Sequence, residues 1–243
     1  MSGHSKWANI KHKKEKSDSK KGKVFTKLGR EIAITVKQGG ADPEANSKLK
    51  DVIAKAKAAN MPNDSITRSI RKAAGDSDGS SYEEITYEGY GPGGVAIIVD
   101  AMTDNRNRTA GEVRHLFDKY GGNLGTAGCV SFMFNRKGVI IIEKDANHDE
   151  DMLMEESLEA GAEDFDAQEE AFEILTSPDD FSGVRQELES KGYAFESADI
   201  EMIPMNTAKL EDPKHLEYIE KLIDALEDLD DVQNVYHNWD FEP

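Results

Sequence analysis

The hydrophobic pattern of this chain changes its period near residue 80, and no other feature of the sequence constrains the fold more. Before that point, apolar residues recur every three to four positions, which is typical of one face of a helix. After it, apolar residues such as Ile85 and Tyr87 alternate with acids, which is typical of half-buried strands. The chain therefore contains both helical and strand-rich parts, and we predict a multi-domain α+β protein.

Residues 1–78 are predicted to form a basic helical domain that begins with a flexible arm. The first 22 residues include seven lysines and carry too little apolar surface to offset the entropy of ordering. A helical pattern then runs from Lys23 to a glycine pair, which is a stop signal. We expect a second helix with Asp42 as its N-cap and Pro43 in its first position, and a third helix that ends at Gly75.

The rest of the chain is predicted to form two ferredoxin-like α/β domains, of which the last is inserted into the middle one. The middle domain would comprise residues 79–134 and 206–243, and we expect alternating residues between Val130 and Phe134 to form one of its strands. Residues 135–205 show the order βαββαβ, which is the ferredoxin-like split unit. The helix and strand after this acidic insertion would return to complete the middle domain.

Charge is distributed very unevenly along the chain. The formal net charge is -18, yet residues 1–75 hold 18 basic and 7 acidic side chains, and residues 138–243 hold 6 basic and 32 acidic ones. Such asymmetry indicates a polyanionic partner for the basic end, because clustered cations attract polyphosphates electrostatically.

The arm HSKWANIKHKKEKSDSKKGK suits a nucleic acid, since lysines neutralise phosphates and an aromatic ring among them can stack on a base. An unordered solvated tail is the alternative. The candidate contact residues are Lys6, Trp7, Lys11, His12, Lys13, Lys14, Lys20, Lys21 and Lys23.

The segment TDNRNRT places Arg106, Asn107 and Arg108 at the junction of a predicted strand and helix. Arginine forks beside the free amides of a helix start can bind a phosphate or a tRNA backbone. The alternative is a simple helix cap, which Asp104 and Asn105 would already explain. The residues alone leave both interpretations open.

Several functional classes lack sequence support. The glycine-rich segments GYGPGG and GGNLGTAG match neither a P-loop nor a dinucleotide fingerprint, so they are tight turns or places where a nucleic-acid backbone approaches. No metal-binding or catalytic motif is present, and Cys129 is the single cysteine. Apolar runs are far too short to span a bilayer. We expect a cytoplasmic monomer without enzymatic activity, cofactor, metal ion or membrane contact.

Four long motifs make the whole chain resemble the YebC family: GHSKWANIKHKK at 3–14, NMPNDSI at 60–66, YEGYGPGGVAIIVDAMTDNRNRT at 87–109 and GGNLG at 121–125. Members are labelled transcriptional regulators, mitochondrial relatives are translational activators of cytochrome c oxidase, and bacterial relatives are regarded as ribosome-associated factors. The resemblance implies three domains, contact of the arm with ribosomal RNA, and a loop at Thr103 to Thr109 that reaches towards peptidyl-tRNA. Cys129 stands where relatives usually carry a small serine.

Together with this resemblance, the residues predict a non-catalytic translation factor that binds the ribosome, through ribosomal RNA and peptidyl-tRNA. The resemblance implies that it would assist peptide-bond formation at proline-rich stretches, which it could do by positioning the reactants. The alternative is a transcriptional regulator that binds double-stranded DNA. No helix in the sequence shows the base-reading pattern that this alternative would require.

Overall fold

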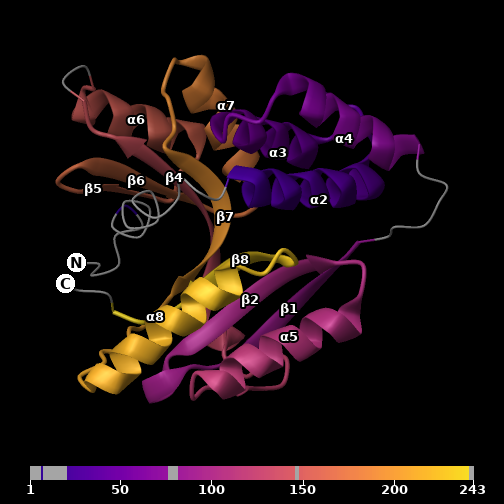
Figure 1. Cartoon of the computed structure of the whole chain (residues 1–243). Helices are drawn as coiled ribbons and strands as arrows, with labels where there is room; N and C mark the ends of the chain where they lie inside the picture. The colour runs from indigo at the N-terminus through magenta and orange to yellow at the C-terminus, as the bar shows by residue number, and fades with distance from the viewer. Residues whose placement is uncertain (1–6, 8–20, 76–81, 146–147, 241–243) are drawn as a thin grey trace. The chain divides into compact units, whose positions relative to one another are not determined.

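The computed structural model describes residue 7 and residues 21–75, 82–145 and 148–240 (Figure 1). The chain divides into two compact units. One contains Gly22–Asn135 and Pro204–Pro243, and the other contains Arg136–Ile203 and includes Trp7. No helix in the described ranges is both long enough and apolar enough to cross a membrane.

The first unit opens with three helices, α2 (Lys21–Gly39), α3 (Ser47–Ala58) and α4 (Asn63–Gly75). Apolar side chains at helical spacing on the three helices pack together into one small core, which is what their sequence period predicts. Its buried members are Leu28, Ile32, Val36, Leu49, Val52, Ala56, Met61 and Ile66.

The start of α3 differs from the prediction. Asn46, and not Asp42, caps this helix: its side-chain oxygen accepts a hydrogen bond from the Leu49 amide at 3.2 Å. Its side-chain nitrogen donates to the carbonyls of Thr35 and Gly40. A carboxamide can accept and donate at once, so Asn46 ties the start of α3 to the end of α2, whereas an aspartate could only accept.

The second part of this unit is a four-stranded sheet with strand order β3-β1-β2-β8. Strands β1 (Glu83–Tyr90) and β2 (Ala96–Thr103) form a hairpin, β3 (Asn123–Leu124) pairs with β1, and β8 (Val232–His237) pairs with β2, all antiparallel. Helices α5 (Arg106–Lys119) and α8 (Pro213–Glu227) cover one face of this sheet (Figure 1). The core between them includes Ile97, Val99, Val113, Phe117, Leu222 and Leu226.

This strand order is not the ferredoxin-like order that we expected for the middle domain. A ferredoxin-like unit begins with a strand, a helix and a strand, whereas here the first two strands pair directly. The tight turn between them is the cause. Gly93 and Gly94 adopt positive φ angles of 68° and 81°, and the Gly91 amide donates to the Val95 carbonyl at 2.7 Å.

The second unit is an antiparallel sheet with strand order β5-β6-β4-β7, and its elements follow one another as βαββαβ, which agrees with the prediction for this segment. The elements are β4 (Phe134–Glu143), α6 (Glu150–Ala160), β5 (Asp164–Ala167), β6 (Ala171–Thr176), α7 (Phe181–Ser190) and β7 (Ser197–Pro204). Leu153 of α6 and Val184 of α7 pack with Ile140 and Ile174 of the sheet.

The predicted strand from Val130 to Phe134 is wrong: residues 131–133 form a 3-10 turn, and Phe132 is 68% exposed.

Both glycine-rich segments are turns packed on their own chain. A Cβ at Gly122 would lie only 2.7 Å from the Tyr90 carbonyl oxygen, so the backbone there packs closely on protein, whereas a Cβ at Gly94 or Gly128 would meet no atom within 4 Å. The loop that follows is held by Glu88, a buried carboxylate that accepts hydrogen bonds from the amides of Gly128, Val130 and Ser131 at 2.8–2.9 Å. Burial opposes ionisation of Glu88, but these amides outweigh it and lower its pKa.

Candidate nucleic-acid interface

The structure describes only some of the residues proposed from sequence to contact nucleic acid. Trp7, Lys23, Arg106, Asn107 and Arg108 lie in the described ranges, and Lys21 is the first residue of α2. The remaining candidates lie outside the described residues: Lys6, Lys11, His12, Lys13, Lys14 and Lys20.

Trp7 packs against the protein itself. Its ring is half-buried against a sheet face of the second unit formed by Val139, Ile141 and Ala171. Its indole Nε1 donates a hydrogen bond to the Glu170 carboxylate at 2.8 Å. A base that stacked on the packed face of this ring would have to displace these contacts.

The cations along α2 are also used within the chain. Lys23 forms an ion pair with Asp228 at 2.8 Å, and Lys27 donates to the Glu227 carbonyl at 2.8 Å. Both acceptors lie at the carboxyl end of α8, where unpaired carbonyls carry the negative end of the helix dipole. Part of the basic charge counted in the sequence therefore stabilises the fold.

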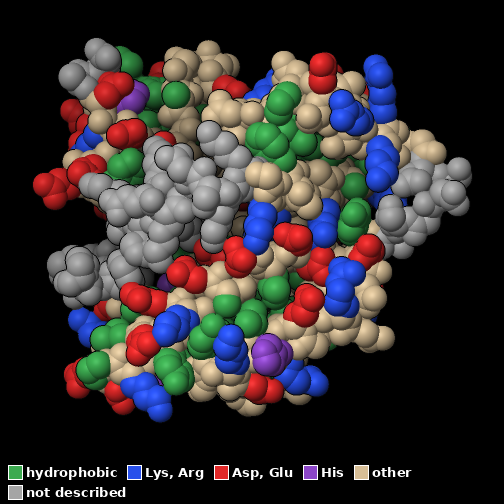
Figure 2. All heavy atoms as spheres, in the orientation of Figure 1, with side chains coloured by type: hydrophobic (Ala, Val, Ile, Leu, Met, Phe, Trp, Pro, Cys, Tyr) green, Lys and Arg blue, Asp and Glu red, His purple; other side chains and the backbone are tan. Residues whose placement is uncertain are grey.

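Five other cations remain exposed on α3 and α4, and no ion pair joins them to another described residue. Figure 2 shows Lys and Arg side chains gathered over α4, on the outer edge of the three-helix part. Neighbouring lysines are different, since Lys55 pairs with Glu31 at 3.2 Å and Lys50 lies 3.8 Å from Glu44. The five exposed cations, which we call the α3–α4 cations, are Lys48, Lys57, Arg68, Arg71 and Lys72.

The α3–α4 cations were not among the site residues proposed from sequence. Their sequence signal was present, because they fall off the apolar stripe of their helices. From the sequence, nucleic-acid binding is assigned to the lysine-rich arm instead. The folded chain shows which cations of α3 and α4 form ion pairs and which do not, and the sequence does not show this.

The segment TDNRNRT caps α5. The Asn105 side chain accepts from the Arg108 amide at 3.1 Å, and the Asn105 amide donates to the Thr103 hydroxyl at 2.9 Å. Capping therefore accounts for Asn105. Arg106 and Asn107 point outward: Arg106 has a side chain 68% exposed whose nearest carboxylate, that of Glu83, is 3.7 Å away.

Arg108 contributes to a buried cluster around Asp231, whose residue exposure is 4%. The Asp231 carboxylate accepts hydrogen bonds from Arg108 at 2.7 Å, Arg30 at 2.6 Å, Thr109 at 2.7 Å and Thr103 at 3.1 Å. Burial by itself would raise the pKa of this carboxyl, but the four donors outweigh that effect and hold the pKa below its usual value. The cluster joins α2, the start of α5 and the approach to β8.

This difference predicts that replacing the two arginines will have unequal effects on the free energy of unfolding. Arg106→Ala is expected to change the free energy of unfolding by less than about 0.5 kcal/mol, since an exposed pair at that distance contributes little. Arg108→Ala is expected to cost about 1–3 kcal/mol, because a buried carboxylate loses a charged donor. Urea denaturation of both variants measures the difference, and equal stabilities would contradict the role assigned to Arg108.

Comparisons with known proteins cover nearly the whole chain. Residues 5–76 match a family model described as the TACO1/YebC protein N-terminal domain, and residues 82–239 match one described as the TACO1/YebC second and third domain. A probable transcriptional regulatory protein of Acetivibrio thermocellus is 72% identical over 98% of this chain and 99% of its own. One of Ruminiclostridium cellulolyticum is 65% identical over 99% and 97%.

A solved structure is similar as well. The crystal structure of a conserved hypothetical protein, Aq1575 of Aquifex aeolicus, matches with a TM-score of 0.82 and 47% sequence identity over 91% of each chain. The names of the two relatives describe regulators and indicate no catalytic activity. In the described ranges, no group of three or more His, Cys, Asp or Glu side chains is placed to hold a metal ion.

Proposed function

Since the chain belongs to the TACO1/YebC family, we propose that it is a non-catalytic regulatory protein that acts by binding the backbone of a nucleic acid. The observation that supports this proposal is the set of α3–α4 cations, which are exposed and unpaired within the described part of the chain. Solvent-exposed cations that pair with no carboxylate can neutralise phosphates and release counterions. This gives affinity for a nucleic-acid backbone without recognition of base sequence.

Control of transcription is the process that the names of the relatives favour, and duplex DNA would then be the bound polyanion. The placement of the cations limits how such binding would work. Recognition helices contact bases with their N-terminal residues, whereas Arg68 lies near the middle of α4 and Arg71 and Lys72 lie in its second half. We therefore propose backbone binding with little base readout.

The second candidate is a translation factor on the ribosome, which was our first expectation from the sequence. The exposed pair Arg106 and Asn107 favours it, because these residues offer a phosphate contact on a different domain from the α3–α4 cations. Two separated contacts suit a folded RNA or a ribosome. The protein would act by positioning reactants, with the basic arm as the anchor and Arg106 and Asn107 against a tRNA or rRNA backbone. Lys23 and Arg108 already pair with Asp228 and Asp231.

Ribosome co-sedimentation and duplex-DNA mobility shifts, each at several salt concentrations, test the proposal. We expect log affinity to fall linearly with log salt concentration. Tighter binding to duplex DNA than to ribosomes would assign the protein to transcription, whereas ribosome retention with much weaker DNA binding would assign it to translation. No affinity for either in dilute buffer would overturn the proposal.

A truncated chain tests the arm separately. Deleting residues 1–20 leaves α2 intact, because this helix begins at Lys21. We expect the truncated protein to keep its thermal unfolding midpoint for the first unit and to lose ribosome binding. Unchanged co-sedimentation would rule out the arm as the anchor.

A further inference from the structure

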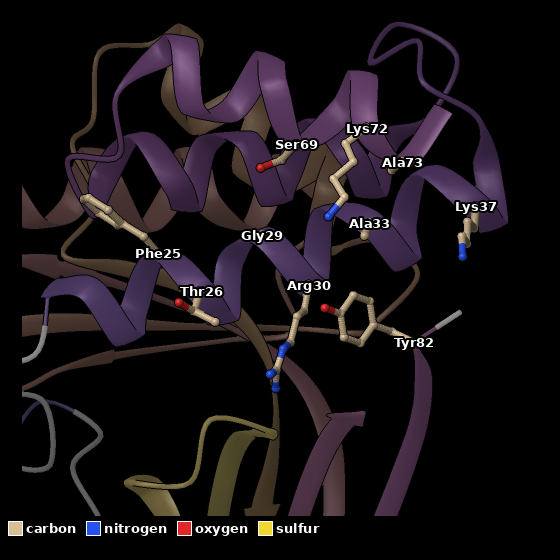
Figure 3. A pocket seen from close by; sticks show the side chains of 10 residues that line it. All are labelled: Phe25, Thr26, Gly29, Arg30, Ala33, Lys37, Ser69, Lys72, Ala73 and Tyr82. Atoms are coloured by element: carbon tan, nitrogen blue, oxygen red, sulfur yellow. The ribbon is translucent and has the colours of Figure 1, made fainter. Parts of the chain in front are cut away.

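A recess of about 240 Å³ lies between α2 and α4 beside Tyr82 (Figure 3). Three cations line it, Arg30 and Lys37 from α2 and Lys72 from α4, and Thr26, Ser69 and Tyr82 add hydroxyl groups. None of its lining residues is an aspartate or a glutamate.

The recess exists because one face of α2 carries small side chains. Thr26, Gly29 and Ala33 follow one another at helical spacing, so these small residues share that face, which Lys37 continues one turn later. A Cβ at Gly29 would meet only the Ser69 hydroxyl, at 3.8 Å, which leaves the space above the helix open. Glycine inside a helix costs about 0.5–1 kcal/mol relative to alanine, so helix stability does not explain its presence here.

The charges in the recess differ in how far they are neutralised. Arg30 is held by Asp231, and its guanidinium lies 5.4 Å from the centre of the Tyr82 ring. Lys72 forms no ion pair within the described part of the chain. In Figure 3, Lys72 reaches from α4 toward α2, and the Tyr82 hydroxyl points toward Arg30.

We propose that this recess binds a phosphate group. A phosphate accepts several hydrogen bonds and carries negative charge, and the recess offers the Lys72 ammonium group and the Tyr82 hydroxyl as donors. The hydroxyls of Thr26 and Ser69 already donate to the carbonyls of Gly22 and Ser65 at 3.1 and 3.0 Å. Its volume is below the roughly 300 Å³ at which sites for drug-sized ligands begin, so it fits a phosphate and part of what the phosphate is attached to. The phosphate could belong to a small phosphorylated molecule or to a nucleic-acid backbone.

A purely structural role for the lysines makes a different prediction. Lys37 and Lys72 lie in the last turns of α2 and α4, where a cation complements the helix dipole. That role would account for two charges but not for the Tyr82 hydroxyl beside them or for the open space over Gly29. Lys119 provides a matched control, because it is an exposed lysine in the last turn of α5 and lies outside the recess.

Titration of the full chain with inorganic phosphate at constant ionic strength, followed by ¹H–¹⁵N NMR, tests the inference. We expect saturable shifts of the Ser69, Lys72 and Tyr82 amides, weakened about tenfold by Lys72→Gln and unchanged by Lys119→Gln. Gly29→Leu should fill the recess and abolish the shifts, and Gly29→Ala is its milder partner if leucine prevents folding. Shifts that are absent, or that respond equally to both lysine variants, would overturn the proposal.

The source of the phosphate is found with a fluorescent single-stranded oligonucleotide. If inorganic phosphate displaces it from the wild type and much less from Lys72→Gln, the recess holds a backbone phosphate. If both bind together, the ligand is a small phosphorylated molecule. The inference stands apart from the proposed function, since oligonucleotide binding that persists without recess shifts would refute the recess alone.

Discussion

Asp231→Ala is expected to lower the free energy of unfolding of the first unit by about 3–5 kcal/mol, the usual cost of removing one partner from a buried charged cluster. The variant leaves Arg30 and Arg108 without their carboxylate, and the hydroxyls of Thr103 and Thr109 without their acceptor. Urea denaturation measures the loss. A Trp7→Phe background leaves Trp239, which lies in the core of the same unit, as the only tryptophan reporter.

Asp230→Ala is the matched control. This neighbour is exposed, and only its backbone carbonyl accepts from Arg30. The Asp230→Ala variant should unfold at nearly the same urea concentration as the parent, since the Asp230 side chain forms no ion pair within the described residues. If both aspartate variants lost equal stability, the cluster would not be the cause.

The pH dependence of this effect has a definite sign. The pKa of Asp231 is lowered in the folded state, so its contribution is fully present above the unfolded value and is lost as pH falls through the folded one. The stability difference between parent and Asp231→Ala should therefore be constant near neutrality and shrink below about pH 3.8, the ordinary aspartate value. A difference that shrank above pH 5 would contradict the assignment.

Replacing all five α3–α4 cations with glutamine is expected to produce the largest change in nucleic-acid binding. If each contacts one phosphate, the slope of log affinity against log salt concentration should become shallower by about 4.5 for duplex DNA and about 3.5 for single strands. At low salt the affinity should fall at least about a hundredfold. Fluorescence anisotropy over a salt series measures both quantities.

A second five-site variant separates local contact from net charge. Changing exposed cations elsewhere in the first unit removes the same number of positive charges: Arg114, Lys119, Lys209, Lys214 and Lys221. We expect the salt slope of this variant to stay close to that of the parent. A similar loss in both variants would mean that overall charge, and not the face of α3 and α4, governs binding.

The type and order of most elements could be predicted from the sequence, because these depend on residues close together in the chain. A window of about ten residues is enough to show the spacing of apolar residues in α2 and α8 and the type of each element of the insertion. The βαββαβ order follows from reading these elements in succession. The predictions were wrong where contacts between residues distant in sequence determine the local structure. Asn46 caps α3 in place of Asp42, and its side chain also donates to the Thr35 carbonyl. Phe132 lies in a 3-10 turn and not in a strand, because Glu88 binds the amides of this loop.

The candidate site was less predictable, for the same reason. The sequence alone determined where positive charge is concentrated and which helices carry it, since these follow from composition and period. Only the tertiary structure decided which charges are available. Lys27 and Arg30 meet acceptors 200 and 201 residues away, and Trp7 meets Glu170 at a separation of 163. An ion pair depends on distance in space, which no local pattern of residues records.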